Sequence, residues 1–333
     1  MKKAYLYCDK RSLNDATVYY VDLVNDCLRA RGYDVAIVHS LKDIKNPDLI
    51  FTITHYNFVK AKVRFPFIKT LNWAQGVGLE EAKMTRSYWK RFPFWLSEQI
   101  TIWLSDMHLF VSEKMCEYYR SHFSYRGDRH VIMPCYNLPL GEFSSIERYS
   151  APTFVYAGGI SKWQGVEILL DTYALVESQI PNASLTTYCK ERDYIIDEAG
   201  KRGIKNIDVK YVPLDQLQEE LQQYKYGFIL REKNWVNYVA TPTKMNSYLA
   251  AYLIPIFSNG VDDFLLNINL EEFTIMAQTP LNSNTIAKQI IAFEKENKCY
   301  DKYKKIVERV FANHYNDNYY KKQIIRKLQE LSM

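Results

Sequence analysis

The chain has 333 residues, more than one hydrophobic core usually supports, so two domains are expected. Apolar residues make up 47% and charged residues 24% of it, which is ordinary for a globular protein and excludes extensive disorder. The net charge is a mild +5, and the six cysteines are scattered without a CxxC pair, which favours free thiols over a disulfide framework or a zinc site.

The first part of the chain alternates strands with helical segments. Residues 15–31 form an amphipathic pattern, with Asn14 or Asp15 as the cap and Gly32 where a left-handed residue often ends a helix. The predicted strands are 4–8, 35–39, 49–54, 68–73, 107–111 and 130–133. This alternation predicts an α/β fold with a parallel sheet covered by helices on both faces.

The alternation restarts after a polar stretch at residues 138–152 that contains Pro, Gly and Ser. The later strands are predicted at 154–156, 185–188, 209–212, 227–230 and 254–257. We therefore expect two doubly wound, Rossmann-like domains, which bind ligands at the carboxyl ends of their strands. The expected parts are an N-terminal domain, a linker, a C-terminal domain, and a final helix that packs back toward the first domain (1–137, 138–152, 153–312 and 313–333).

A helix start at Thr241-Pro242-Thr243-Lys244 is the sharpest local signal. Thr241 suits an N-cap, and Pro242 suits the first helical position, where its missing N–H costs nothing. Lys244 would then lie at the end of the helix dipole that disfavours a cation, and a bound phosphate would resolve this conflict. A solvated surface lysine is the equally weighted alternative.

The segment from Gly158 to Gly165 lies directly between a predicted strand and a predicted helix. Glycines allow the backbone to approach a ligand closely, and the following helix start offers amide donors. The segment is neither GxGxxG nor a P-loop, so by itself it is a weak signal.

Four segments resemble glycosyltransferase family 4 and its relatives. FVYAGGISKWQGVEILLDTYALV resembles the opening of that family's C-terminal domain, and LREKNWVNYVATPTKMNSYLAAYLIPIFS resembles the donor-site segment of a branch that assembles bacterial capsule, exopolysaccharide and O-antigen. LNWAQGVGLEE and LFVSEKMCEYY are similar to N-terminal-domain segments of that branch. The resemblance implies the GT-B fold, a nucleoside-diphosphate sugar donor between the domains, retention of anomeric configuration, and no cofactor or catalytic metal.

The sequence departs from the family at several donor contacts. Val239 and Ser247 stand where two glutamates commonly occur, and the second of these normally accepts hydrogen bonds from the donor ribose. Gly159 and Gln164 stand where many members carry Arg and Lys. The positive charge for the diphosphate must then come from Lys162, Arg231 or Lys244.

The resemblance and the motifs together nominate three sets of site residues. The expected catalytic residues are Lys244, Arg231 and Gln75. The expected donor-binding residues are Gly158, Gly159, Lys162, Gln164, Val212, Asn237, Thr241, Pro242, Thr243 and Ser247. The expected acceptor-side residues are Ser12, Asn14, His55 and Gly76, although a lone histidine such as His55 is more often structural.

Residues 60–91 hold eight basic side chains against two acidic ones, and residues 83–96 interleave cations with Trp and Phe. This mixture suits an anionic membrane interface, while the plain alternative is a helix with a basic face in water and a buried aromatic face. No recognition motif accompanies the charge, so nucleic acid is not an expected partner. The apolar stretches are too short to span a bilayer, so we expect a cytoplasmic protein, peripheral on the inner face of the plasma membrane.

The favoured hypothesis is a hexosyltransferase that moves a sugar from a nucleotide donor to a bacterial surface glycan or lipid-linked oligosaccharide. The missing glutamate pair motivates an alternative, a catalytically silent GT-B protein that binds a partner transferase or a glycan. An epimerase or phosphorylase on the same fold would need no separate acceptor.

Overall fold

The computed structural model describes residues 1–10, 12–13 and 17–331. The expected acceptor residue Asn14 and the expected helix cap at residues 14–15 lie outside the described residues. The chain divides into two compact units. The first consists of Met1–Asn137, Val239–Thr241 and Tyr315–Met333, and the second of Leu138–Tyr238 and Pro242–His314.

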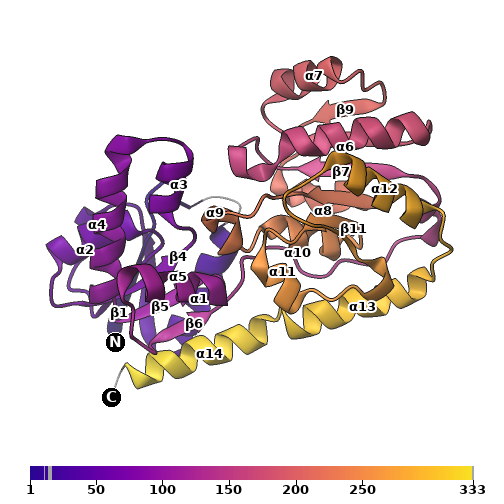
Figure 1. The fold of residues 1–333 in the computed structure, drawn as a ribbon. Coiled ribbons are helices and arrows are strands. Elements are labelled where there is room, and N and C mark those ends of the chain that lie inside the picture. Colours follow the sequence, from indigo (N-terminus) through magenta and orange to yellow (C-terminus); the bar gives the residue numbers. More distant parts are fainter. Residues whose placement is uncertain (11, 14–16, 332–333) are drawn as a thin grey trace. The chain divides into compact units, whose positions relative to one another are not determined.

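The first unit contains a six-stranded parallel sheet in the order β2-β1-β3-β4-β5-β6 (Figure 1). Its strands are β1 (Lys2–Tyr7), β2 (Tyr33–Val38), β3 (Leu49–Thr52), β4 (Lys69–Ala74), β5 (Met107–Phe110) and β6 (His130–Ile132). Every residue of β3 and β5 is buried, as expected for central strands that are covered on both faces.

Six helices flank this sheet. They are α1 (Val18–Ala30), α2 (His55–Arg64), α3 (Gly78–Met84), α4 (Tyr88–Leu104), α5 (Glu113–Phe123) and α14 (Asp317–Glu330). Gly32 has φ +80° directly after α1, which confirms the predicted stop. The C-terminal helix α14 packs on α1, and Asp317 accepts hydrogen bonds from the hydroxyls of Tyr19 and Tyr136 at 2.6 and 2.9 Å.

The second unit repeats the architecture with a parallel sheet in the order β12-β11-β10-β7-β8-β9. Its strands are β7 (Thr153–Ala157), β8 (Ser184–Tyr188), β9 (Ile207–Lys210), β10 (Tyr226–Ile229), β11 (Ile254–Ser258) and β12 (Ile275–Ala277). Its helices are α6 (Val166–Gln179), α7 (Arg192–Lys201), α8 (Leu214–Leu221), α9 (Trp235–Tyr238), α10 (Thr243–Ala250), α11 (Asp262–Asn267), α12 (Ser283–Glu294) and α13 (Tyr300–Asn313). Figure 1 shows these helices flanking the sheet, with α6 beside α12.

The predicted strands are confirmed to within two residues at either end, because apolar runs bounded by turn residues mark buried parallel strands. The prediction missed β12, a three-residue edge strand that is too short to carry a period. Residues 138–152, expected as a linker, pack on the second unit: the Gly141 N–H donates to the carbonyl of Ala250, and the rings of Tyr149 and Tyr300 stack at 3.9 Å.

Candidate functional site

In the second sheet the strand order reverses between β7 and β10. From β7 the chain proceeds outward through β8 and β9, and then returns to add β10 on the other side of β7. Ligands of doubly wound sheets bind at the carboxyl ends of the strands where the order reverses in this way. Gly158 follows β7 directly, and Arg231 follows β10 after one residue.

Two glycines bring the loop after β7 close to its neighbours. Gly158 has φ +148°, and a Cβ there would lie 2.7 Å from Cε of Lys244. Gly165 has φ +66°, and a Cβ there would lie 2.2 Å from the carbonyl oxygen of Leu230. The loop therefore runs against the end of β10 and against Lys244, at distances that only glycine permits.

Gln164 holds two cations together. Its Oε1 accepts from Nζ of Lys244 at 2.5 Å and from Nη2 of Arg231 at 3.0 Å. Lys244 also donates to the hydroxyl of Tyr156 at 3.4 Å, and Nη1 of Arg231 donates to Oδ1 of Asn237 at 3.2 Å. Nε of Arg231 is buried without a hydrogen-bond partner. Lys244 and Arg231 thus share a neutral acceptor and retain unused donor capacity.

No carboxylate balances this charge among the described residues: none forms an ion pair with Lys244 or Arg231. Burial lowers the pKa of Lys244 well below its ordinary value, and the nearby Arg231 guanidinium lowers it further. Burial also lowers the pKa of Arg231, which is 6% exposed, to about 10. Buried charges are normally paired, so the buried Arg231 beside the partly buried Lys244, with no carboxylate on either, forms a site that favours an anionic ligand.

Replacing Lys244 with Met is expected to stabilise the fold, because the fold now keeps an ammonium group out of water without a counter-ion. The lowered pKa means that the unfolded chain binds more protons than the folded chain below the ordinary Lys pKa. The destabilisation that Lys244 causes therefore grows as the pH falls from the ordinary Lys pKa toward the lowered pKa of the folded chain. We expect Lys244→Met to raise the free energy of unfolding by ~1–3 kcal/mol near neutral pH, and by less at alkaline pH.

Urea denaturation at about pH 7.5 and about pH 9.5 measures this difference. A Lys244→Met variant less stable than the unmodified chain at both pH values would contradict the interpretation of Lys244 as a partly buried cation without a counter-ion.

The prediction that Thr241 caps the next helix was wrong. α10 begins at Thr243 with Pro242 in the capping position and no side-chain cap. The hydroxyl oxygen of Thr241 instead accepts from the Cys135 N–H at 2.8 Å within the first unit. Lys244 nevertheless lies in the first turn of α10, as predicted, and its side chain extends to Gln164.

The other expected donor residues are spread around this cluster. The Gly159 carbonyl accepts from the hydroxyl of Tyr156 at 2.5 Å, and Asn237 is fully buried beside Arg231. Lys162 is exposed, and Val212 follows β9. The Ser247 hydroxyl donates to the Thr243 carbonyl at 3.1 Å, an ordinary bond within the helix.

Tyr156 is the member of the cluster that the sequence analysis missed. Its ring centroid lies 4.7 Å from Nζ of Lys244. Its position near the end of β7, two residues before Gly158, was the available signal, but a tyrosine in a strand usually indicates only core packing.

The acceptor-side predictions lie at the carboxyl ends of strands in the first unit. Nε2 of His55 lies 2.9 Å from the hydroxyl of Tyr119, which also donates to the Gly76 carbonyl at 3.4 Å. Gln75 donates to the Ile53 carbonyl at 3.1 Å. Ser12 lies in a turn after β1, where its N–H and hydroxyl both bond to Asp9. His55, Gly76 and the missed Tyr119 form one connected group, and Gln75 is adjacent to it in the chain.

Two buried groups near these residues have shifted pKa values. Burial lowers the pKa of His55 to about 4, so the imidazole is neutral at physiological pH. Burial raises the pKa of Glu98 to about 8, although its Oε1 accepts from the Leu79 N–H at 3.1 Å. The sequence analysis missed Glu98; the signal was that it is the only charged residue between Arg91 and Asp106. A protonated Glu98 can donate a hydrogen bond, which an ordinary surface glutamate cannot.

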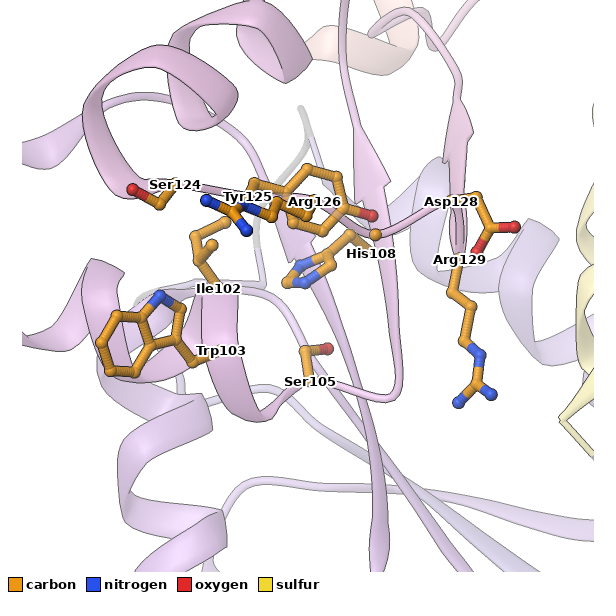
Figure 2. A pocket seen from close by; sticks show the side chains of 10 residues that line it. Ile102, Trp103, Ser105, His108, Ser124, Tyr125, Arg126, Asp128 and Arg129 are labelled. Carbon is orange, nitrogen blue, oxygen red and sulfur yellow. The ribbon is translucent and has the colours of Figure 1, made fainter.

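A separate cavity of about 320 Å³ lies at the other edge of the first sheet, at the amino ends of β5 and β6. Figure 2 shows His108 among the side chains of Ser105, Tyr125, Arg126 and Arg129 that line it. None of the predicted site residues lies there, so this cavity is distinct from both groups described above.

Two further properties concern the described part of the chain. None of its helices is both long enough and apolar enough to cross a membrane. Within the same residues, no three His, Cys, Asp or Glu side chains gather in an arrangement that could hold a metal ion.

Comparisons of sequence and of structure gave different results. No family model matches the chain, and no curated protein matches it in sequence. Among solved structures, sucrose-phosphate synthase from Thermosynechococcus elongatus has a TM-score of 0.71 at 14% identity, with 99% of each chain covered. Anabaena HepE, solved with UDP and glucose, has a TM-score of 0.72 at 11% identity, with 99% of this chain and 100% of its own covered.

A variant of S. aureus TarM, solved with fondaparinux, α-GlcNAc-glycerol and UDP, has a TM-score of 0.63 at 10% identity. The alignment covers 85% of this chain, which spans only 55% of the TarM length. These structural neighbours are glycosyltransferases, and their common architecture is two Rossmann-like domains. The chain therefore has the GT-B fold of the nucleotide-sugar glycosyltransferases.

Proposed function

We propose that this protein is a glycosyltransferase that takes a sugar from a nucleoside-diphosphate donor. The observation that carries the proposal is the pair of cations, the partly buried Lys244 and the buried Arg231, that share Gln164 without a carboxylate. They lie at the strand ends where doubly wound sheets bind ligands, on a fold whose solved neighbours include complexes with UDP.

The proposed chemistry is electrostatic. When the bond between the sugar and the diphosphate breaks, negative charge grows on the leaving diphosphate oxygens. Lys244 and Arg231 would stabilise this charge in a site that excludes most water, where each interaction is stronger than in bulk solvent. In this proposal the protein supplies the positive charge through these side chains rather than through a metal ion, and no side chain acts as a covalent nucleophile.

The contacts of Gln164 support a role that its departure from the family pattern left open. A lysine at this position would add a third cation beside Lys244 and Arg231, whereas the amide oxygen of Gln164 accepts from both. We propose that Gln164 orients the two cations before the donor binds. Ser247, which bonds to the Thr243 carbonyl, would contribute little to ribose binding.

Thermal unfolding in the presence of nucleoside diphosphates tests the donor proposal. We expect at least one nucleoside diphosphate, with UDP as the first candidate, to stabilise the chain, while the corresponding nucleoside does not. At a ligand concentration of 100 Kd the expected stabilisation is ~2.7 kcal/mol. Arg231→Gln should remove most of this stabilisation, because it removes the charge that lies beside Lys244.

The same measurement separates the proposal from its alternatives. A silent GT-B protein that binds a partner or a glycan would show no response to any nucleoside diphosphate. An epimerase or phosphorylase would act without a separate sugar acceptor. Transfer of labelled sugar from the best donor to added acceptors would distinguish these enzymes from a transferase.

We further propose that the sugar is a hexose, that the acceptor is a bacterial surface glycan or lipid-linked oligosaccharide, and that anomeric configuration is retained. The support is the sequence resemblance, together with neighbours solved with glycan-related ligands such as the TarM complex. Ser12, His55 and Gly76 are the candidates on the acceptor side, and Gln75 is the catalytic candidate in the same unit. This activity would operate in the cytoplasm at the inner face of the plasma membrane.

A further inference from the structure

The first half of α4 lacks a buried face. Trp89 is 94% exposed and Phe92 66% exposed, and the other apolar side chains of this half are exposed as well (Tyr88, Phe94, Trp95 and Leu96). Every residue from 88 to 96 is exposed except Arg91, which is partly buried. The expectation of a buried aromatic face is therefore wrong for this half of the helix.

The second half of the same helix has one buried face, although Trp103 and Leu104 at its end are 68% and 54% exposed. Its residues Glu98, Thr101 and Ile102 are buried in the first unit. A helix in water normally turns its apolar side chains toward a core, and a helix that is apolar all round is normally buried. Among the described residues of the first unit, the aromatic side chains at the start of α4 are therefore left exposed, although Phe94 lies against Gly78 of α3.

Basic side chains surround the exposed rings. Lys90 and Arg86 are exposed, and the Arg91 guanidinium lies 4.2 Å from the ring centroid of Tyr88. The two acidic residues of this region are turned inward: Glu80 bonds to Lys83 and to the hydroxyl of Tyr118, and Glu81 is only partly exposed. The outward-facing charge is therefore positive.

The neighbouring helix α2 continues the same pattern. It packs beside α4 in the first unit (Figure 1). Its exposed side chains Tyr56 and Val63 are seven residues apart, which places them on one helical stripe with Lys60, whose Nζ lies 4.1 Å from the Tyr56 ring centroid. Exposed aromatic rings with neighbouring cations therefore occur on both α2 and α4. In the sequence, only residues 83–96 suggested this mixture.

We propose that the α4 segment Tyr88–Leu96 inserts its aromatic side chains into the headgroup region of an anionic lipid bilayer, with the surrounding Lys and Arg on lipid phosphates. Aromatic rings that sit at headgroup depth, with cations beside them, match an interfacial membrane helix. A purely apolar protein partner would bury these rings but would leave the cations without anions. This inference concerns a surface of the first unit and does not depend on the donor proposal.

Sedimentation with vesicles tests it on the full chain. We expect binding to vesicles of phosphatidylcholine and phosphatidylglycerol at equal proportions, much weaker binding to phosphatidylcholine alone, and release at high salt. Trp89→Ser combined with Phe92→Ser should reduce binding by at least tenfold, and Arg86→Glu with Lys90→Glu should reduce it similarly. Leu265→Ser with Leu266→Ser is the matched control, because these α11 residues are also exposed but belong to the second unit.

Three results would overturn the proposal. The first is failure of the unmodified chain to bind either kind of vesicle. The second is vesicle binding that the α4 variants leave unchanged. The third is a concentration-dependent oligomer that only the α4 variants disrupt, which would assign this surface to a second copy of the chain. Stabilisation by nucleoside diphosphates should be the same for the α4 variants and the unmodified chain, so failure of this proposal is distinguishable from failure of the donor site.

Discussion

Replacing Lys244 with Ala is expected to lower the turnover of sugar transfer by about 10²–10³-fold, the usual loss when one preorganised charge-stabilising donor is removed. Among the described residues, the Lys244 side chain has no partner of opposite charge. Its Nζ donates to Gln164 and to Tyr156, which lies near the end of β7. Its removal deletes half of the positive charge in the cluster and leaves Arg231 to stabilise the leaving diphosphate.

Rates of transfer with the best donor measure this effect, and Lys205→Ala is the control because Lys205 is an exposed lysine of the same unit. The expected pattern is a large loss for Lys244→Ala at saturating donor and none for Lys205→Ala. Near-normal transfer by Lys244→Ala would refute the catalytic assignment. Increased stability of Lys244→Met together with lost transfer would instead show a functional residue retained at the expense of stability.

Gly165→Ala is expected to destabilise the second unit by ~2–4 kcal/mol, because it combines an unfavourable positive φ with a steric overlap in the backbone. The added Cβ would lie 2.2 Å from the Leu230 carbonyl oxygen and 3.1 Å from the carbonyl carbon. Neither atom belongs to a side chain that could rotate away. Relief requires the loop to move from the end of β10, which would also displace Gln164 from Lys244 and Arg231.

Gly200→Ala is the matched control for this substitution. Gly200 lies in α7, and a Cβ there meets no atom within 4 Å, so the substitution should be neutral or should stabilise the helix by ~0.5–1 kcal/mol. Urea denaturation of the three proteins provides the comparison. Equal midpoints for Gly165→Ala and the unmodified chain would show that the loop after β7 accommodates a side chain, contrary to the packing described here.

The sequence by itself determined the parallel sheets and nominated most residues of the cluster around Lys244 and Arg231. Strands such as Leu49–Thr52 and Ile254–Ser258 are mostly apolar in sequence and buried throughout, because both of their faces are covered. Gly158, Arg231 and Lys244 could be nominated because each lies at a strand end or helix start, and these positions follow from the local pattern. Their nomination as site residues stays a prediction until it is tested.

Only the tertiary structure decided which of these residues meet. Gln164 was known from the sequence only as a departure from a family pattern, and the long-range approach of β7, β10 and α10 makes it the acceptor shared by two cations. Thr241 has the local features of a helix cap, but its hydroxyl accepts from Cys135, more than 100 residues away in the chain. The first half of α4 likewise has many aromatic side chains, as a buried helix does, and only the three-dimensional packing shows that they stay exposed in the first unit. In each case local propensity depends on neighbouring residues, whereas side-chain partners depend on which distant segments the fold brings together.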